Sequence, residues 1–287
     1  TGTNAQTGTI AIGASALTAL TSGASNLAIG YQAADAITSG GYSICIGESA
    51  GGALTGSNSN SNIAIGYQAL TAATTNAEKN VAIGNQAMYG DWSTAAVDEC
   101  VSIGYGSMKG VLTADAIGTV AIGSNALTAL TAGAGNVAVG YQALKTCTDD
   151  SQSTAVGHQA LATANGASGN NARNTALGYK AGYDIADGQY NSLVGHEAGA
   201  NLTSGSRNSV LGISALGTAT SDGYNVAIGY SALVNQNTAG VSAYNTCVGY
   251  SAGDSISTGA QNTGIGADVA FDIDANNQTC VGYQATT

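Results

Sequence analysis

The chain has 287 residues, of which only 8% are charged and 42 are glycine, and it contains no proline. A typical globular domain carries about 25% charged residues, so this composition argues against an ordinary enzyme. The hydrophobic fraction of 44% is near the globular norm, which excludes a disordered chain. Small side chains fill an ordinary core poorly, so we expect an architecture built on close approach of the backbone.

Seventeen acidic residues against six basic ones give the chain a net charge of −11. This sign opposes binding to nucleic acid, which depends on neutralising phosphates, and to anionic membranes. No run of about 20 apolar residues is present, so we expect no membrane insertion in this segment. The sequence begins with Thr1 rather than methionine, and we expect it to be part of a longer chain.

One short phrase recurs along the whole sequence, in forms such as NLAIGYQA, NVAIGNQA and NTCVGYSA. Its glycine recurs every 16–21 residues, without a linker, so we predict one repeat domain over residues 1–287 with about 16 coils. These anchoring glycines are Gly13, Gly30, Gly47, Gly66, Gly84, Gly104, Gly123, Gly140, Gly157, Gly178, Gly195, Gly212, Gly229, Gly249, Gly266 and Gly282.

The repeat is too short for paired helices, which need about 33 residues, and its apolar residues alternate with a period of two. We therefore predict an all-β parallel solenoid in which each copy of the phrase is a strand stacked on the next. With a rise of about 4.8 Å per strand, such coils predict a rod about 75 Å long.

The predicted strand has two apolar faces. Ile, Val or Leu precedes every anchoring glycine, and we interpret this column as the solenoid core. The residue before it is mostly Ala or Cys, and a smooth column of this kind predicts close packing against another backbone. An identical chain is the simplest partner. We predict the interface between chains at Ala28, Cys45, Ala64, Ala82, Ala121, Ala138, Ala155, Ala176, Ala227, Cys247 and Cys280.

A polar column and an aromatic column flank the strand. Asn stands four residues before the glycine in ten copies, and we expect these amides to form a ladder along the stack. Eight of the fourteen tyrosines directly follow an anchoring glycine. We expect them to stack at the corners of the coils, and the alternative is an exposed aromatic track for sugar rings.

The phrases NVAIGYSA and NTCVGYSAG, separated by TSG-type spacers, resemble the head repeats of trimeric autotransporter adhesins and the related shafts of bacteriophage tail fibres. This resemblance covers nearly all of residues 9–287. It implies a left-handed parallel β-roll, a homotrimer and a role in attachment to a cell surface. The long spacers are more similar to phage fibres than to adhesin heads.

Residues typical of catalysis or metal binding are sparse. His158 and His196 both occupy the position after an anchoring glycine, about 10 Å apart along the stack, too far to share a metal ion. The segment from Asp272 begins like a calcium-binding loop, but Asn277 replaces its required glycine. The five cysteines have no CxxC spacing. We therefore predict no catalytic residues, no metal and no cofactor.

The longest repeats predict loops that leave the coil, and such loops are often binding sites. One of them carries Tyr89, Asp91 and the single tryptophan, Trp92, and we predict these three as receptor contacts. The hypothesis is a homotrimeric phage tail fibre on the virion that binds a host glycan or protein. The alternatives are a bacterial surface adhesin and, third, a polysaccharide-degrading tailspike, which needs two carboxylates facing one groove.

Overall fold

The computed structural model describes residues 7–55, 59–71, 77–90, 97–111, 116–165, 172–238, 242–272 and 276–286. The chain divides into two compact units, Thr1–Gln142 and Ala143–Thr287. The repeat phrase continues in the sequence on both sides of residue 142. That the chain forms a single repeat domain stays a prediction.

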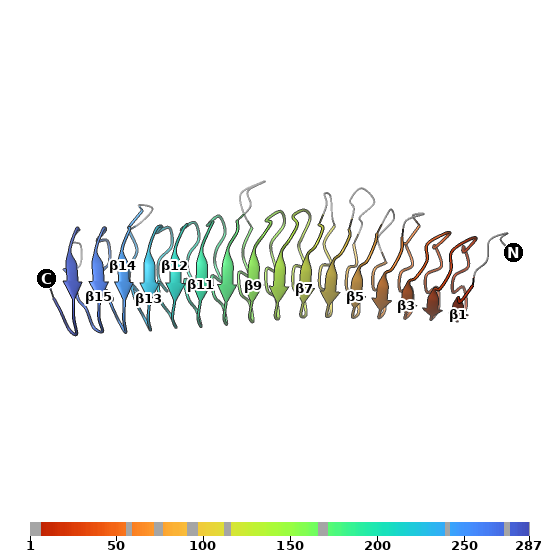
Figure 1. Ribbon diagram of the computed structural model, residues 1–287, viewed down its shortest axis with the longest axis horizontal. Coiled ribbons are helices and arrows are strands. Elements are labelled where there is room, and N and C mark those ends of the chain that lie inside the picture. The colour runs from red at the N-terminus through yellow and green to blue at the C-terminus, as the bar shows by residue number, and fades with distance from the viewer. Residues whose placement is uncertain are drawn as a thin grey trace. The chain divides into compact units, whose positions relative to one another are not determined.

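Every named strand of the described residues has three residues. Figure 1 shows the strands as short arrows joined by longer turns. Those of the first unit are β1 (Ile10–Ile12), β2 (Leu27–Ile29), β3 (Ile44–Ile46), β4 (Ile63–Ile65), β5 (Val81–Ile83), β6 (Val101–Ile103), β7 (Val120–Ile122) and β8 (Val137–Val139). Those of the second unit are β9 (Thr154–Val156), β10 (Thr175–Leu177), β11 (Ser192–Val194), β12 (Ser209–Leu211), β13 (Val226–Ile228), β14 (Thr246–Val248), β15 (Thr263–Ile265) and β16 (Thr279–Val281).

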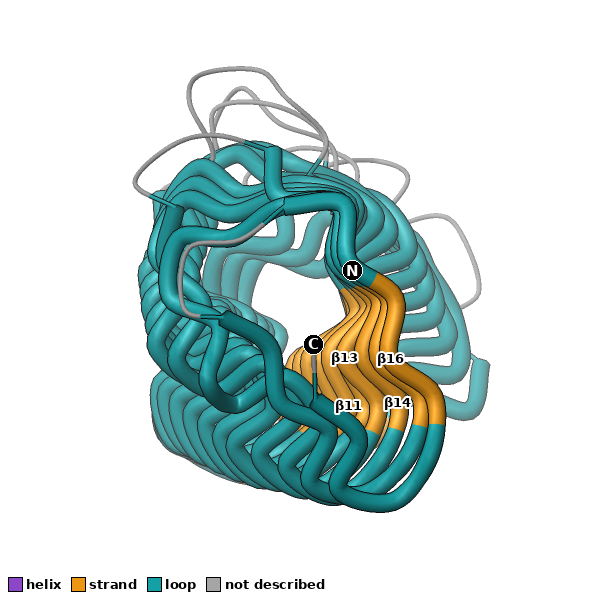
Figure 2. Tube along the Cα trace, turned by 90° about the vertical axis from the view of Figure 1, so that its left-hand side faces the viewer, coloured by secondary structure: helices purple, strands orange, loops and turns teal. Residues whose placement is uncertain are grey.

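Within each unit the strands pair in parallel and in chain order. The register is the same throughout, so that Ala28 pairs with Cys45 and Cys45 with Ala64. Figure 2 shows β11, β13, β14 and β16 stacked on one side of the coil, with turns completing each circuit. The structure thus confirms the all-β parallel β-solenoid. Its left-handedness stays a prediction.

The strands end at the anchoring glycines because of their backbone conformation. These glycines have φ between +124° and +151°, a region that residues with a side chain rarely adopt. The coils also stack closely here: a Cβ added at Gly66 would lie 2.5 Å from the carbonyl oxygen of Gly84 in the next coil. The glycine column therefore serves contacts between coils of one chain, and the sequence does not need a second chain to explain it.

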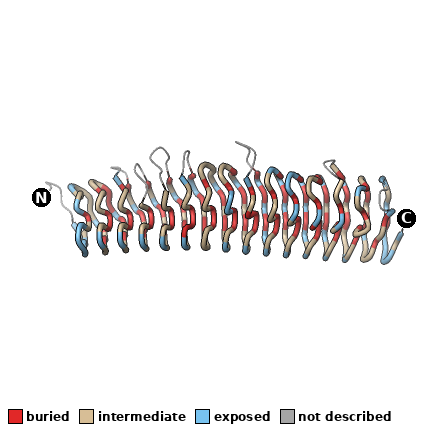
Figure 3. The backbone as a smooth tube through the Cα atoms, turned by 180° about the vertical axis from the view of Figure 1, so that it is seen from behind, coloured by how far each residue is buried: buried red, intermediate tan, exposed pale blue. Residues whose placement is uncertain are grey.

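The two faces of the strand are the reverse of the prediction. The middle residue of each strand, which we call the inner column, points into the coil and is buried from β2 to β16. The first and third residues, which we call the outer columns, are half-buried or exposed. Figure 3 shows this alternation of buried and more exposed residues along the coils.

Large side chains of the core come instead from the turns that follow each strand. Leu70, Leu127 and Leu161, each four residues after an anchoring glycine, are fully buried. They fill much of the interior from the opposite wall, so the inner column usually holds a small side chain.

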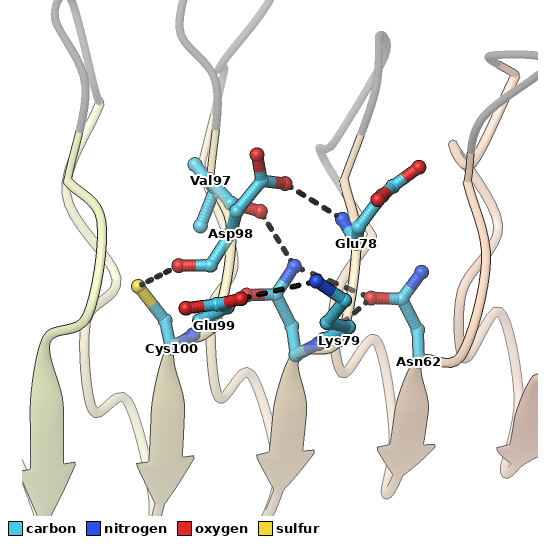
Figure 4. A network of polar contacts seen from close by, with 8 residues as sticks. Asn62, Glu78, Lys79, Val97, Asp98, Glu99 and Cys100 are labelled. Carbon is cyan, nitrogen blue, oxygen red and sulfur yellow. Dashed lines mark hydrogen bonds and ion pairs between the residues drawn. The ribbon is translucent and has the colours of Figure 1, made fainter.

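The asparagine column forms the predicted ladder inside the coil. Asn62 and Asn80 are fully buried, and Asn62 Oδ1 accepts hydrogen bonds from the backbone N–H of Asn80 at 3.1 Å and from its Nδ2 at 3.2 Å. Asn80 Nδ2 also donates to the carbonyl oxygen of Val97 at 2.6 Å (Figure 4). The ladder therefore binds neighbouring coils and also fixes each coil to its own return segment.

A cysteine substitutes for asparagine in one rung. Cys100 N–H donates to Asn80 Oδ1 at 3.0 Å, and its Sγ donates to the carbonyl oxygen of Ala116 at 2.6 Å. Beside it, Lys79 and Glu99 form a surface ion pair at 3.0 Å (Figure 4). Because both side chains are exposed, this pair contributes little to stability.

Candidate interaction surface

The outer columns of the first unit form an apolar surface. From β2 to β8 the first and third residues of every strand are Ile, Leu or Val, and all are half-buried. Apolar side chains at this density on the outside of a sheet are unusual for a soluble monomer. Because the strands are in register, the two columns run side by side along the unit.

The second unit carries a more polar version of the same surface. Its first outer column is Thr or Ser in every strand except β13, where it is Val226. Its third residue is Val, Leu or Ile throughout, and Leu177 and Leu211 are 49% and 51% exposed. One apolar column therefore continues through this unit, bordered by hydroxyl groups.

An aromatic column lies beside these aliphatic residues. The tyrosines that follow the anchoring glycines are exposed, among them Tyr67, Tyr141 and Tyr250. Tyr230 and Tyr250 stack with ring centroids 5.3 Å apart. The rings therefore stack, as expected, and also present one edge to solvent.

The two histidines belong to this column. His158 and His196 lie on either side of Tyr179, with centroid distances of 5.3 and 4.9 Å. The intervening ring excludes a shared metal ion. In the part of the chain that the structure describes, no cluster of three or more His, Cys, Asp or Glu residues could hold a metal.

A second exposed row combines arginine with tyrosine on the other side of the strands, five residues before the glycine. Arg173 and Arg207 both lie over the ring of Tyr190, at 5.6 and 5.3 Å from its centroid, and Arg207 also lies 5.2 Å from that of Tyr224. Tyr224 stacks on Tyr244 at 4.8 Å. Stacked cations and rings stabilise this corner of the coil.

The predicted interface residues between chains are placed differently from the prediction. The small side chains at the inner column lie inside their own coil, with at most 5% of their surface exposed, so they cannot contact another chain. This corrects the prediction for Ala28, Cys45, Ala64, Ala82, Ala121, Ala138, Ala155, Ala176, Ala227, Cys247 and Cys280. The outer columns are the residues that the sequence reasoning missed. The sequence feature that could have revealed this orientation is the leucine that recurs four residues after the anchoring glycine. A large side chain there needs a small residue of the strand beside it inside the coil.

The predicted receptor contacts are only partly within the described residues. Tyr89 is half-buried, and the Lys109 ammonium lies 5.5 Å from the centroid of its ring. Asp91 and Trp92 lie outside the described residues, so their role stays a prediction.

One groove of about 430 Å³ lies in the second unit. Its lining includes two carboxylates, Asp184 and Glu197, together with Lys180 and Tyr183. Asp184 and Glu197 stand 13 residues apart in the sequence and form no local motif. The solenoid brings these two residues of successive coils to one groove.

No protein-family model, curated protein or solved structure matches the chain. Over the described ranges, no helix has the length and apolar character needed to cross a membrane.

Proposed function

We propose that this chain is a segment of a homotrimeric fibre, most simply a bacteriophage tail fibre on the virion, that attaches to a host cell surface without catalysis. The observation that carries the proposal is the pair of aliphatic outer columns from β2 to β8. Contact of such an apolar surface with water is unfavourable. Burying it stabilises the assembly by about 1.5–3 kcal/mol at most for each aliphatic side chain.

Two further copies of this chain are the proposed occupants of that surface. Identical parallel solenoids place identical columns at matching heights, so rotation about an axis parallel to the stack brings every outer column against its counterpart. The number three, the left-handedness and the attachment role come from the resemblance to adhesin heads and tail-fibre shafts. A bacterial surface adhesin is the alternative with the same assembly.

Sedimentation of the purified chain tests the assembly. We expect three times the chain mass, and we expect Ile44→Asp combined with Ile63→Asp to give a monomer, because each substitution places a carboxylate within the buried surface. Thr18→Asp is the matched control, since Thr18 is exposed outside the columns. A monomeric native chain would refute the proposed interface.

Attachment needs a separate measurement. We expect the fluorescently labelled trimer to bind a subset of bacterial strains in a panel and the monomeric double variant to bind more weakly, because trimerisation multiplies the contacts. Absence of binding across the panel would count against the attachment role while leaving the assembly intact.

Polysaccharide cleavage is the second candidate, because Asp184 and Glu197 line one groove. Paired carboxylates are the usual machinery of glycoside hydrolysis. If the chain is a tailspike, reducing ends accumulate when it is incubated with host polysaccharide, and Asp184→Asn and Glu197→Gln abolish this. No release of reducing ends removes this candidate.

A further inference from the structure

The groove of the second unit arises from a local change in the size of one repeat position. The fifth residue after the anchoring glycine is Tyr183, Ala200, Gly217 and Val234 in four successive coils. Ala200 and Gly217 leave a depression in the floor, and the larger Tyr183 and Val234 bound it along the stack. Nowhere else in the sequence do two residues as small as these follow each other at this position. The hollow is therefore specific to these coils and is no general property of the repeat.

Polar side chains from two further columns also line the groove. Lys180, Glu197 and Ser214 stand two residues after their glycines, and Asp184, Asn201 and Thr218 stand six residues after them. Hydrogen bonds between coils hold these positions: the backbone N–H groups of Glu197 and Asp184 donate to the carbonyl oxygens of Tyr179 and Ala200, both at 2.8 Å. The polar groups therefore project from a rigid scaffold.

The chemistry of this lining suits a carbohydrate. The carboxylates of Asp184 and Glu197 are strong acceptors for hydroxyl groups. Asn201 Nδ2 and Thr218 Oγ1 donate to the carbonyl oxygens of Gly217 and Val234 at 2.6 and 2.7 Å, so their oxygen atoms add further acceptors. Among the described residues, neither carboxylate pairs with a lysine or arginine, and Glu197 Oε2 lies 3.8 Å from Nδ1 of the neighbouring His196. The ring of Tyr183 adds an aromatic surface at one end.

Charge narrows the class of ligand. The groove holds one cation, Lys180, and two carboxylates, and Lys180 itself lies 5.0 Å from the centroid of the Tyr183 ring. The site is therefore net negative and disfavours sulfated or carboxylated sugars. Its volume of about 430 Å³ falls within the range of small-ligand sites, roughly 300–1,000 Å³.

We infer that this groove binds a neutral saccharide, with Asp184 and Glu197 accepting hydrogen bonds from sugar hydroxyls and Tyr183 packing against a ring. None of its residues belongs to the outer columns, so the proposed assembly of three chains does not use them. The inference rests on the proposed attachment function for its biological purpose and identifies the chemical class of a host ligand.

Titration with defined trisaccharides tests the inference on the full chain. Neutral trisaccharides of glucose, galactose and mannose are compared with trigalacturonic acid and with the polyamine spermidine, by saturation-transfer NMR and calorimetry. We expect binding of at least one neutral trisaccharide and none of the acidic one. Binding of spermidine alone, or of no neutral sugar, would overturn the inference.

Variants distinguish the groove from other surfaces. Glu197→Gln and Asp184→Asn each preserve shape, and we expect each to weaken binding by about tenfold, whereas Ala200→Leu fills the floor and abolishes it. Asp35→Asn, at the equivalent floor position of a coil in the first unit, is the control and should bind like the native chain. Thermal unfolding of each variant verifies the fold.

The two proposals fail separately. If the groove variants lose trisaccharide binding and still attach to cells, the attachment function stands and uses another surface. If the native chain binds the trisaccharide and no cell, the groove is a saccharide site and the attachment function is wrong. Equal binding by native chain and Ala200→Leu overturns the groove assignment whatever the cells show.

Discussion

Asparagine side chains inside the coil form hydrogen bonds with backbone groups that would pair with a neighbouring strand in an ordinary sheet. Asn191 Oδ1 accepts the backbone N–H of Asn208 at 3.0 Å, and its Nδ2 donates to the carbonyl oxygen of Gly205 at 2.8 Å. These backbone groups lie where the coil enters its three-residue strand and where no neighbouring strand reaches them. A buried backbone group without a partner is costly, so the asparagines are required by the backbone path.

We expect Asn191→Ala to reduce the free energy of unfolding by about 2–6 kcal/mol, because it leaves a buried N–H and a buried C=O unpaired at about 1–3 kcal/mol each. Asn235→Ala is the matched control. Its Nδ2 also donates to a backbone carbonyl, that of Asp254 at 2.8 Å, but the side chain is exposed, and water replaces the bond. Urea denaturation measures both, and similar losses in the two variants would contradict the ladder's role.

The thiols are a second residue-scale feature with a measurable consequence. All five cysteines are free and buried. Desolvation by burial raises the pKa of Cys45 and Cys247 to about 12, and that of Cys100 to about 11. A protonated thiol is a poor nucleophile. These residues therefore behave as small apolar side chains, as expected for the inner column in Cys45 and Cys247.

At pH 8 we expect a maleimide reagent to label Cys45, Cys100 and Cys247 of the native chain about a hundredfold more slowly than in 6 M guanidinium, because their thiolates are suppressed and covered. The folded pKa values lie above those of the unfolded thiols, about 8.5. The contribution of these thiols to the free energy of unfolding is therefore fully present below pH 8.5 and is lost as the pH rises towards 12. The reason is that the unfolded state then releases protons that the folded state retains. Fast labelling of the native chain would contradict this burial.

At the scale of the strand, size compensation accounts for two of the larger residues and for the one glycine at the inner column. Leu193 and Cys247 are larger than the usual alanine at the inner column, and in both coils the position where leucine recurs becomes glycine, Gly199 and Gly253. A Cβ at Gly253 would lie 2.5 Å from the Cys247 sulfur. β15 shows the converse, because its inner residue is Gly264 and the single phenylalanine, Phe271, fills the space beside it.

This pairing predicts a coupled double substitution. A Cβ at Gly264 would lie 2.9 Å from two ring carbons of Phe271, so we expect Gly264→Ala to destabilise the fold by about 1–3 kcal/mol through overpacking. Phe271→Leu removes part of the ring volume and should cost about 1–2 kcal/mol alone. The double variant should lose clearly less than the sum of the two, as measured by urea denaturation. Additive losses would show that the two side chains do not share this space.

The space available inside the coil explains which features of the fold could be predicted from the sequence and which could not. The strand positions, their parallel stacking and the asparagine ladder follow from the spacing of the anchoring glycines and the period of two. The two faces were interchanged because Ile29 and Ala28 are both apolar, so hydrophobicity alone does not distinguish inside from outside. The decisive property is the width of the interior, which Leu70 and its equivalents set from the opposite wall, and the groove likewise depends on contacts between coils.

At the scale of the whole molecule, charge and apolar surface act in opposite directions on assembly. Each chain carries a net charge of −11, so three copies brought together repel one another. The outer columns of the first unit contain no charged residue, and their burial does not depend on ion pairs. The proposed trimer is therefore held by the hydrophobic effect against electrostatic repulsion, the reverse of an interface based on salt bridges.

We therefore expect the trimer to become more stable as sodium chloride rises from 10 mM to 500 mM, since the screening length falls from about 30 Å to less than 8 Å. Sodium sulfate should have a stronger effect at equal ionic strength, because it also strengthens apolar burial. Sedimentation at low micromolar concentration measures the trimer fraction, with the Ile44→Asp and Ile63→Asp double variant as a control that stays monomeric. Dissociation on adding salt would instead require ion pairs between chains, which the aliphatic outer columns cannot supply, and the interface would have to lie elsewhere.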